Sequence, residues 1–164
     1  MVKVSLNKNE EFLVGEDKVL VYILASLFFL LFLYGLIDAI LHHFQQLTYM
    51  SFIFLIALAP AILFLRKGKN NRIYIRINKK GIYQDEKLIT DWSHLLKVYI
   101  SQKERVASIQ DNFVLVVEYR KVGINDGFRR KIPLTNTQNK SEEEVLEAVN
   151  FFWKVFKYDA FDNN

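Results

Sequence analysis

The chain has 164 residues, no cysteine and a formal net charge of +4. This length leaves room for about one domain, and the absence of cysteine excludes disulfides, zinc–thiolate sites and a cysteine nucleophile. Residues 1–65 carry three basic and five acidic side chains, whereas residues 66–164 carry 19 and 13. This asymmetry indicates that the basic second part meets a negatively charged surface.

Two apolar runs follow a short N-terminal segment, residues 1–18. Residues 19–37 and 47–65 contain no charged side chain, and each is close to the roughly 20 apolar residues that a helix needs to cross a bilayer. Neither run has the polar stripe of a water-soluble core helix. A second run so soon after the first argues against a cleaved signal peptide. The pattern predicts a two-helix transmembrane hairpin over residues 19–65, with Pro60 as a candidate kink.

The orientation of this hairpin is predicted from its basic residues. The linker, residues 38–46, contains no Lys or Arg and is long enough only to turn the chain. Arg66, Lys67, Lys69 and Arg72 follow the second run, with no acidic residue among them. Because Lys and Arg concentrate on the cytoplasmic side of membrane helices, the sequence predicts that both termini are cytoplasmic.

After the second run the hydrophobic period changes to two, which is typical of half-buried strands. About seven short antiparallel strands are expected, at residues 73–77, 82–83, 88–92, 96–100, 106–109, 113–119 and 128–134. Residues 123–127 are expected to form a hairpin loop. Ser141 and Glu144 have the spacing of a capping box, followed by an apolar stripe at helical spacing. The sequence therefore predicts an α+β domain over residues 72–158, an antiparallel barrel or sandwich capped by a C-terminal helix.

Three short stretches carry a family resemblance: residues 77–82 (INKKGI), 87–95 (KLITDWSHL) and 131–134 (KIPL). They resemble small bacterial membrane proteins with a pleckstrin-homology-like domain, the YcxB-like group among them. In that family a strand ends in a Gly-Ile turn, and the next closes on a Trp, a small polar residue and an aliphatic residue. Here Thr90 and Asp91 depart from the apolar–Pro pair expected before the Trp. The resemblance implies a pleckstrin-homology-like fold in the bacterial inner membrane, with no catalytic residue to carry over.

The candidate site is a set of basic residues that would contact anionic lipid. Its members are Arg66, Lys67, Lys69, Arg72, Arg129 and Lys131. Each such charge near an anionic bilayer contributes about 1 kcal/mol, and strand alternation places Arg129 and Lys131 on one face. The four residues after the second apolar run could instead serve only as a topology signal. Arg129 and Lys131 could instead belong to a solvated edge strand, where charge discourages aggregation.

Two other polar groups invite a functional interpretation. Asp38, His42 and His43 would suit a metal or pH-sensing site, but a metal normally needs three or four converging ligands, so a polar linker is the preferred interpretation. Ser93 and His94 are adjacent, and neighbours in a strand point to opposite faces. The sequence therefore predicts no Ser–His catalytic pair at this point.

The expected function is that of a non-enzymatic, membrane-anchored binding or scaffold module. The sequence contains no phosphate-binding loop, zinc-protease motif or nucleophile elbow, and Trp92 and Trp153 are expected in the core. We expect no cofactor, metal or nucleic acid; the expected partners are membrane lipids and a protein not yet identified. An immunity or inhibitor protein that neutralises a toxin at the membrane would have the same sequence features and stays open as the alternative. A channel or enzyme subunit ranks third.

Overall fold

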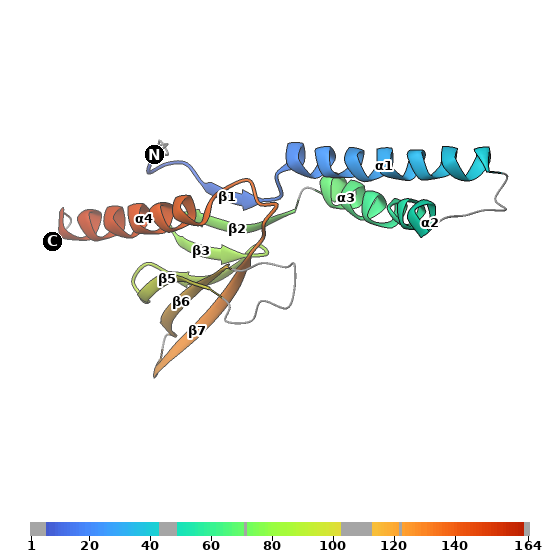
Figure 1. The fold of residues 1–164 in the computed structure, drawn as a ribbon. Helices are drawn as coiled ribbons and strands as arrows, with labels where there is room; N and C mark the ends of the chain where they lie inside the picture. Colours follow the sequence, from blue (N-terminus) through green and yellow to red (C-terminus); the bar gives the residue numbers. More distant parts are fainter. Residues whose placement is uncertain (1–5, 43–48, 71, 103–112, 122, 163–164) are drawn as a thin grey trace. The chain divides into compact units, whose positions relative to one another are not determined.

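The computed structural model describes residues 6–42, 49–70, 72–102, 113–121 and 123–162. The chain divides into two compact units (Figure 1). The helical unit consists of residues 16–72, and the β unit consists of residues 1–15 together with residues 73–164.

The first helix of the helical unit is α1, Lys18–Leu41. It begins after Asp17, whose side chain accepts a hydrogen bond of 3.1 Å from the Leu20 N–H and so satisfies one of the free amides at the helix start. It ends at Leu41, and the next residue, His42, caps it by donating its N–H to the Asp38 carbonyl at 3.1 Å. The helix is thus four residues longer at its C-terminal end than the apolar run that predicted it.

The second apolar run forms two helical segments, α2 (Tyr49–Ile56) and α3 (Leu58–Asn70), with Ala57 between them. Pro60 has no N–H to donate to the Ile56 carbonyl four residues earlier, so the regular ladder is interrupted there. The Ala57 N–H instead bonds to the Phe54 carbonyl, three residues back, at 3.0 Å. The second apolar run is thus interrupted at Ala57, one turn before Pro60; a kink at Pro60 stays a prediction.

Small side chains lie between the antiparallel helices of this unit. A Cβ atom added at Gly35 would lie 2.6 Å from Phe54 Cβ, so only glycine allows the helices to approach this closely. The other buried small residues of this unit in the described part of the chain are Ala25, Ala39, Ser51, Ala57, Ala61 and Gly68. Most of the large apolar side chains point outward. In the most apolar stretch of α1 only 17 % of the residues are buried, and in the most apolar stretch of residues 51–70 only 22 % are buried. Both helices are long and apolar enough to cross a membrane, as the sequence predicts.

The β unit contains two antiparallel sheets. The first has the order β1-β2-β3-β4. Its strands are β1 (Phe12–Gly15), β2 (Ile73–Asn78), β3 (Gly81–Gln84) and β4 (Lys87–Asp91). Alternate residues of β2, Ile75 and Ile77, are fully buried, as the period of two requires.

Strand β1 is not predicted by the sequence, which places residues 1–18 in a segment outside the soluble domain. Phe12 pairs with Ile77 and Val14 with Ile75, and both β1 side chains are buried in the core. The whole helical unit is therefore an insertion between two neighbouring strands of one sheet. The edge of β1 is partly closed by Asn139, whose side chain accepts from the Gly15 N–H at 3.0 Å and whose own N–H donates to the Gly15 carbonyl at 2.9 Å.

The second sheet has the order β5-β6-β7. Its strands are β5 (Leu95–Gln102), β6 (Phe113–Lys121) and β7 (Ile124–Leu134). The hairpin loop predicted at residues 123–127 is wrong: β7 already begins at Ile124, because Gly123, with a φ of +79°, allows a tight turn. The strand predicted at residues 106–109 lies outside the described residues.

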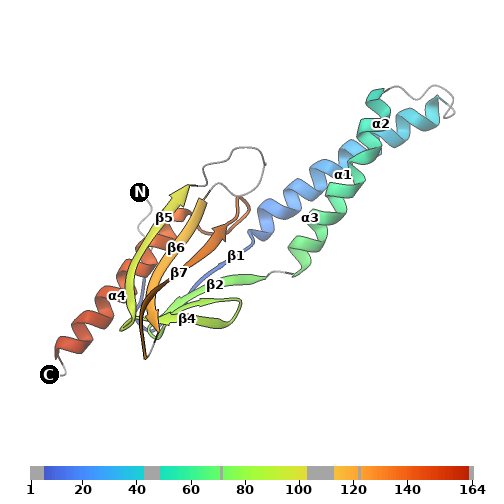
Figure 2. The ribbon, with the colours of Figure 1, turned by 90° about the horizontal axis from the view of Figure 1, so that it is seen from below.

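The C-terminal helix α4, Glu142–Asp162, packs against β2 and β5, one strand from each sheet (Figure 2). The predicted capping box is present: the Glu144 N–H donates to Ser141 Oγ at 3.2 Å, and the Ser141 N–H donates to Glu144 Oε2 at 2.7 Å. Trp92 is buried, as expected. Trp153 is only partly buried at the margin of the core, with Lys157 Nζ 4.0 Å from its ring centre.

The two-residue turn between β3 and β4 leads to a prediction about stability. Asp85 and Glu86 both have positive φ values, 47° and 67°. Asp tolerates this conformation, but a residue such as Glu is strained there by roughly 1–2 kcal/mol. Glu86→Gly is therefore expected to raise the free energy of unfolding by about 1 kcal/mol, after the entropy cost of glycine.

Thermal unfolding of the full chain in mild detergent, followed by circular dichroism, checks this expectation. Glu86→Ala is the matched control, because it removes the same carboxylate but keeps the Cβ atom and should not stabilise the chain. Equal melting temperatures for the glycine variant and the alanine variant would show that the turn is unstrained.

Candidate functional site

Three of the predicted lipid-contact residues, Arg66, Lys67 and Lys69, lie toward the C-terminal end of α3, and Arg72 follows that helix. Arg66 and Lys69 are exposed. Lys67 Nζ lies 3.1 Å from a carboxylate oxygen of Glu16, which is largely buried. The charge of Lys67 is therefore compensated within the helical unit, and Arg72 has an interaction of its own. All four suit the negative end of the helix dipole as well as a membrane surface.

The other two predicted residues, Arg129 and Lys131, share one face of β7, as strand alternation predicts. They lie opposite Glu118 and Val116 of β6. Arg129 donates to Glu118 Oε1 from Nε at 2.9 Å, and its Nη2 lies 2.7 Å from the same oxygen. Lys131 is exposed and forms no ion pair within the described part of the chain. Of this pair, Lys131 is thus the residue whose charge is available to a lipid phosphate.

Arg130 lies between these two residues and points to the other face of the sheet. It is opposite Val117, whose side chain belongs to the core. Its Nε donates to Gln84 Oε1 at 2.9 Å, which connects β7 of the second sheet to β3 of the first. Arg130 is not among the lipid-contact residues predicted from the sequence. The signal was available, because the same alternation puts this cation on the side of Ile132 and Leu134, where an apolar residue is expected.

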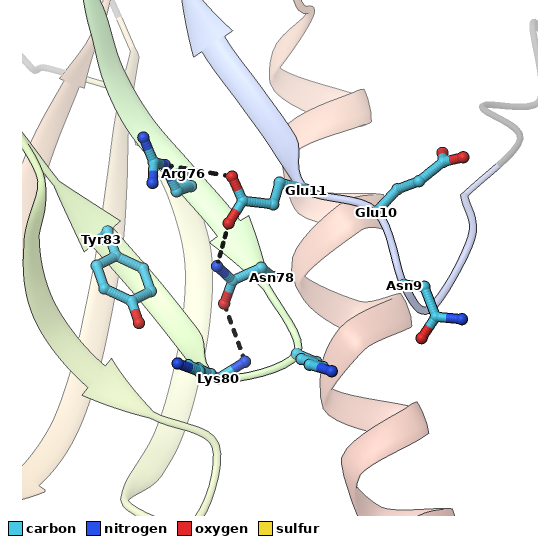
Figure 3. Close-up of a pocket in the computed structure, with 8 residues that line it drawn as sticks. Asn9, Glu10, Glu11, Arg76, Asn78, Lys80 and Tyr83 are labelled. Carbon is cyan, nitrogen blue, oxygen red and sulfur yellow. Dashed lines mark hydrogen bonds and ion pairs between the residues drawn. The ribbon is translucent and has the colours of Figure 1, made fainter.

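A pocket of 260 Å³ lies between the N-terminal segment and the β2–β3 hairpin (Figure 3). Several of its polar groups bond to one another. Asn78 Nδ2 donates to Glu11 Oε1 at 2.8 Å, and the Lys80 N–H donates to Asn78 Oδ1 at 2.9 Å. Arg76 Nε lies 3.6 Å from Glu11 Oε2. This network holds the start of β1 against β2 and engages the side chains of Glu11, Arg76 and Asn78.

The expectation that Ser93 and His94 point apart is wrong, because residues 92–94 form a turn between β4 and β5. Ser93 Oγ lies 2.9 Å from His94 Nδ1. Asp91 Oδ1 accepts from Ser93 Oγ at 2.7 Å and lies 2.7 Å from the same Nδ1. A catalytic triad needs the carboxylate on one ring nitrogen and the nucleophile on the other. Here both use Nδ1, so the group fits a stabilised turn.

The protonation of Asp91 agrees with this structural role. Partial burial raises the pKa of its carboxyl group. The hydrogen bonds from Ser93 and His94 and the charge of His94 lower the pKa, and together they outweigh the effect of burial. The net result is a pKa below the ordinary value. Asp91 is therefore ionised at neutral pH and acts as an acceptor for the turn.

Asp38 links the two antiparallel helices of the helical unit. Its carboxylate accepts a hydrogen bond from Ser51 Oγ, which is buried in α2. His42 Nδ1 lies 2.9 Å from the Asp38 carbonyl oxygen and 3.5 Å from its carboxylate. His43 lies outside the described residues. Within the described residues no group of three or more His, Asp or Glu side chains converges as a metal site would require. The arrangement fits a polar link between helices.

Comparison of the chain with protein-family models, curated proteins and solved structures finds no match. Membership of the YcxB-like group therefore stays a prediction. The function has to be inferred from the residues and topology of this chain.

Proposed function

We propose that this chain is a non-enzymatic, membrane-anchored binding module whose β unit works at the cytoplasmic surface of the bacterial inner membrane. The main support is topological, since two helices of membrane-spanning character are inserted between neighbouring strands β1 and β2. Only two residues separate Gly15 from Lys18, and only two separate Asn70 from Ile73. Two connections this short keep the β unit within a few residues' reach of the bilayer.

The architecture of the β unit supports the pleckstrin-homology-like fold inferred from the sequence. It has a four-stranded and a three-stranded antiparallel sheet, with a C-terminal helix that contacts both. The cations at the end of α3 favour the cytoplasmic orientation. Anionic lipid headgroups are the proposed ligands of the basic surface, and a protein partner is proposed for the exposed remainder of the module.

A single fluorescent label tests whether the β unit contacts anionic lipid. Because the chain has no cysteine, Pro133→Cys provides one attachment point, on the same face of β7 as Lys131. The labelled full chain is placed in nanodiscs of phosphatidylcholine alone or with phosphatidylglycerol. We expect a more apolar label environment with phosphatidylglycerol, and loss of this difference at about 0.5 M salt, where screening acts within a few ångströms.

Two variants make the lipid test specific. Lys131→Gln should reduce the response to phosphatidylglycerol, because it removes the exposed cation of this face. Arg129→Gln should reduce it less, because Glu118 already compensates that charge. A label response that is identical in both lipids would contradict the proposal that this face meets the membrane.

A further inference from the structure

A cleft separates the free edge of the first sheet from the end of the second. It runs between β4 and the β3–β4 turn on one side and β6 and β7 on the other, and its larger part has a volume of 440 Å³. A smaller part of 180 Å³ continues along β4 toward His94. Both parts share Leu88, Ile89, Tyr119 and Lys121 in their walls. The combined space is within the range of small-ligand sites.

Four cations line this cleft: Lys87, Arg120, Lys121 and Arg130. None of them forms an ion pair with a carboxylate within the described ranges, unlike Arg76, Arg129 and Lys67 elsewhere. Arg130 donates one hydrogen bond, from Nε to the neutral side-chain amide of Gln84. Both terminal nitrogens of its guanidinium group can therefore still donate to a ligand. Lys121 Nζ lies 4.4 Å from the centre of the Phe128 ring.

The two carboxylates in the walls of the cleft are already engaged. Asp91 accepts hydrogen bonds from Ser93 and His94 in the β4–β5 turn. Asp85 lies in the β3–β4 turn and has an interaction of its own. Four cations against two occupied carboxylates leave a net positive cleft, in which an added anion gains charge-assisted hydrogen bonds.

The walls also offer apolar surface beside these charges. Leu88 is 51 % exposed although it lies in a strand, and Ile89 and Tyr119 are partly buried next to it. Ile89 occupies the bulge of β4, where the ladder with β3 loses its regular register. A ligand that combines phosphate with an apolar part would satisfy both kinds of surface, whereas inorganic phosphate would use only the cations.

The position of the cleft in the first sheet favours a lipid. Gln84 pairs with Ile75, and the Asp85 N–H donates to the Tyr74 carbonyl at 3.1 Å. The β3–β4 turn therefore lies at the end of the sheet where Gly15 pairs with Ile73. From that same end the chain continues into α1 and arrives from α3, the two helices of membrane-spanning character.

We propose that this cleft binds the phosphate headgroup of an anionic phospholipid, with Arg130 and Lys87 on the phosphate and Leu88 against the glycerol and first methylenes. This inference rests on the proposed membrane-anchored function and adds to it a defined lipid site. The site is on the opposite face of the second sheet from Arg129 and Lys131.

The test uses the full chain in a neutral detergent and measures dissociation constants by native mass spectrometry. The probes are short-chain phosphatidylglycerol, phosphatidylcholine with the same chains, and inorganic phosphate. Arg130→Gln and Lys87→Gln are each expected to raise the dissociation constant for phosphatidylglycerol about tenfold or more, as removal of a hydrogen bond to a charged group does. Lys154→Gln is the matched control, because it removes one exposed charge from α4, outside both proposed lipid surfaces. Its expected effect is below about twofold.

The possible results distinguish the proposed lipid site in the cleft from the proposed membrane-anchored function. Equal losses for Arg130→Gln and Lys154→Gln would overturn the cleft and leave diffuse attraction to lipid standing. Phosphatidylcholine binding as tight as phosphatidylglycerol binding would overturn the headgroup assignment. Inorganic phosphate that competes at comparable affinity would assign the cleft to a soluble phosphate compound instead. A selective loss in the two cleft variants, with unchanged melting temperatures, supports the proposal even if the label on β7 shows no membrane contact.

Discussion

Replacement of residues 16–72 by a short Gly/Ser turn is expected to give a folded, water-soluble β unit. Gly15 and Ile73 are partners in the β1–β2 ladder, so their Cα atoms lie about 5 Å apart and a turn of two to four residues can join them. The replacement removes the exposed apolar surface of α1, α2 and α3 and leaves the strands of both sheets intact. The β content by circular dichroism and a dispersed amide NMR spectrum are the measurements.

The matched control lacks residues 1–15 and begins at Ile73. It is expected to unfold or aggregate, because it loses Phe12 and Val14, which are 5 % and 0 % exposed. Truncation of a buried side chain of this size costs about 2–5 kcal/mol, and a small domain has only about 5–15 kcal/mol in total. The open edge of β2 would also be available for pairing with other chains. Equal stability of the two versions would show that β1 is dispensable.

Trp92→Ala is expected to destabilise the β unit by about 3–5 kcal/mol, the usual cost of truncating a large buried aromatic side chain. Trp92 is 2 % exposed and stacks on Phe152 of α4, with ring centres 6.4 Å apart. Its Nε1–H donates to the Asn78 carbonyl at 2.9 Å, so the substitution also removes the partner of that carbonyl.

Urea unfolding of the full chain in mild detergent measures this change. Trp153→Ala is a suitable comparison, because Trp153 is only partly buried and should lose less stability. An unchanged unfolding midpoint in Trp92→Ala would contradict the burial of Trp92 against α4.

The parts of the fold that depend on local patterns were predicted from the sequence. Both apolar helices and the capping box of α4 depend on composition and spacing over a few residues. Strand β1 was missed for a physical reason. It has four residues, and its partner β2 follows after an insertion of 57 residues, so no local pattern indicates the pairing.

The candidate site shows the same limit. Alternation correctly put Arg129 and Lys131 on one face of β7. The ion pair between Arg129 and Glu118 depends on the register of β6 against β7, which the sequence does not reveal. The cleft around Arg130 depends on how β4 and β6 come together from different sheets. Only the tertiary structure brings Lys87 and Arg130 to the same cavity.

Reporter fusions test most directly the central claim, that a two-helix hairpin anchors the β unit on the cytoplasmic side. Alkaline phosphatase, active only outside the cytoplasm, and green fluorescent protein, active as a reporter inside, are fused separately at each terminus and in the predicted linker near His43. The account predicts fluorescence without phosphatase activity at both termini, and phosphatase activity in the linker. Strong phosphatase activity from the C-terminal fusion would contradict it and would place the β unit on the opposite side of the membrane.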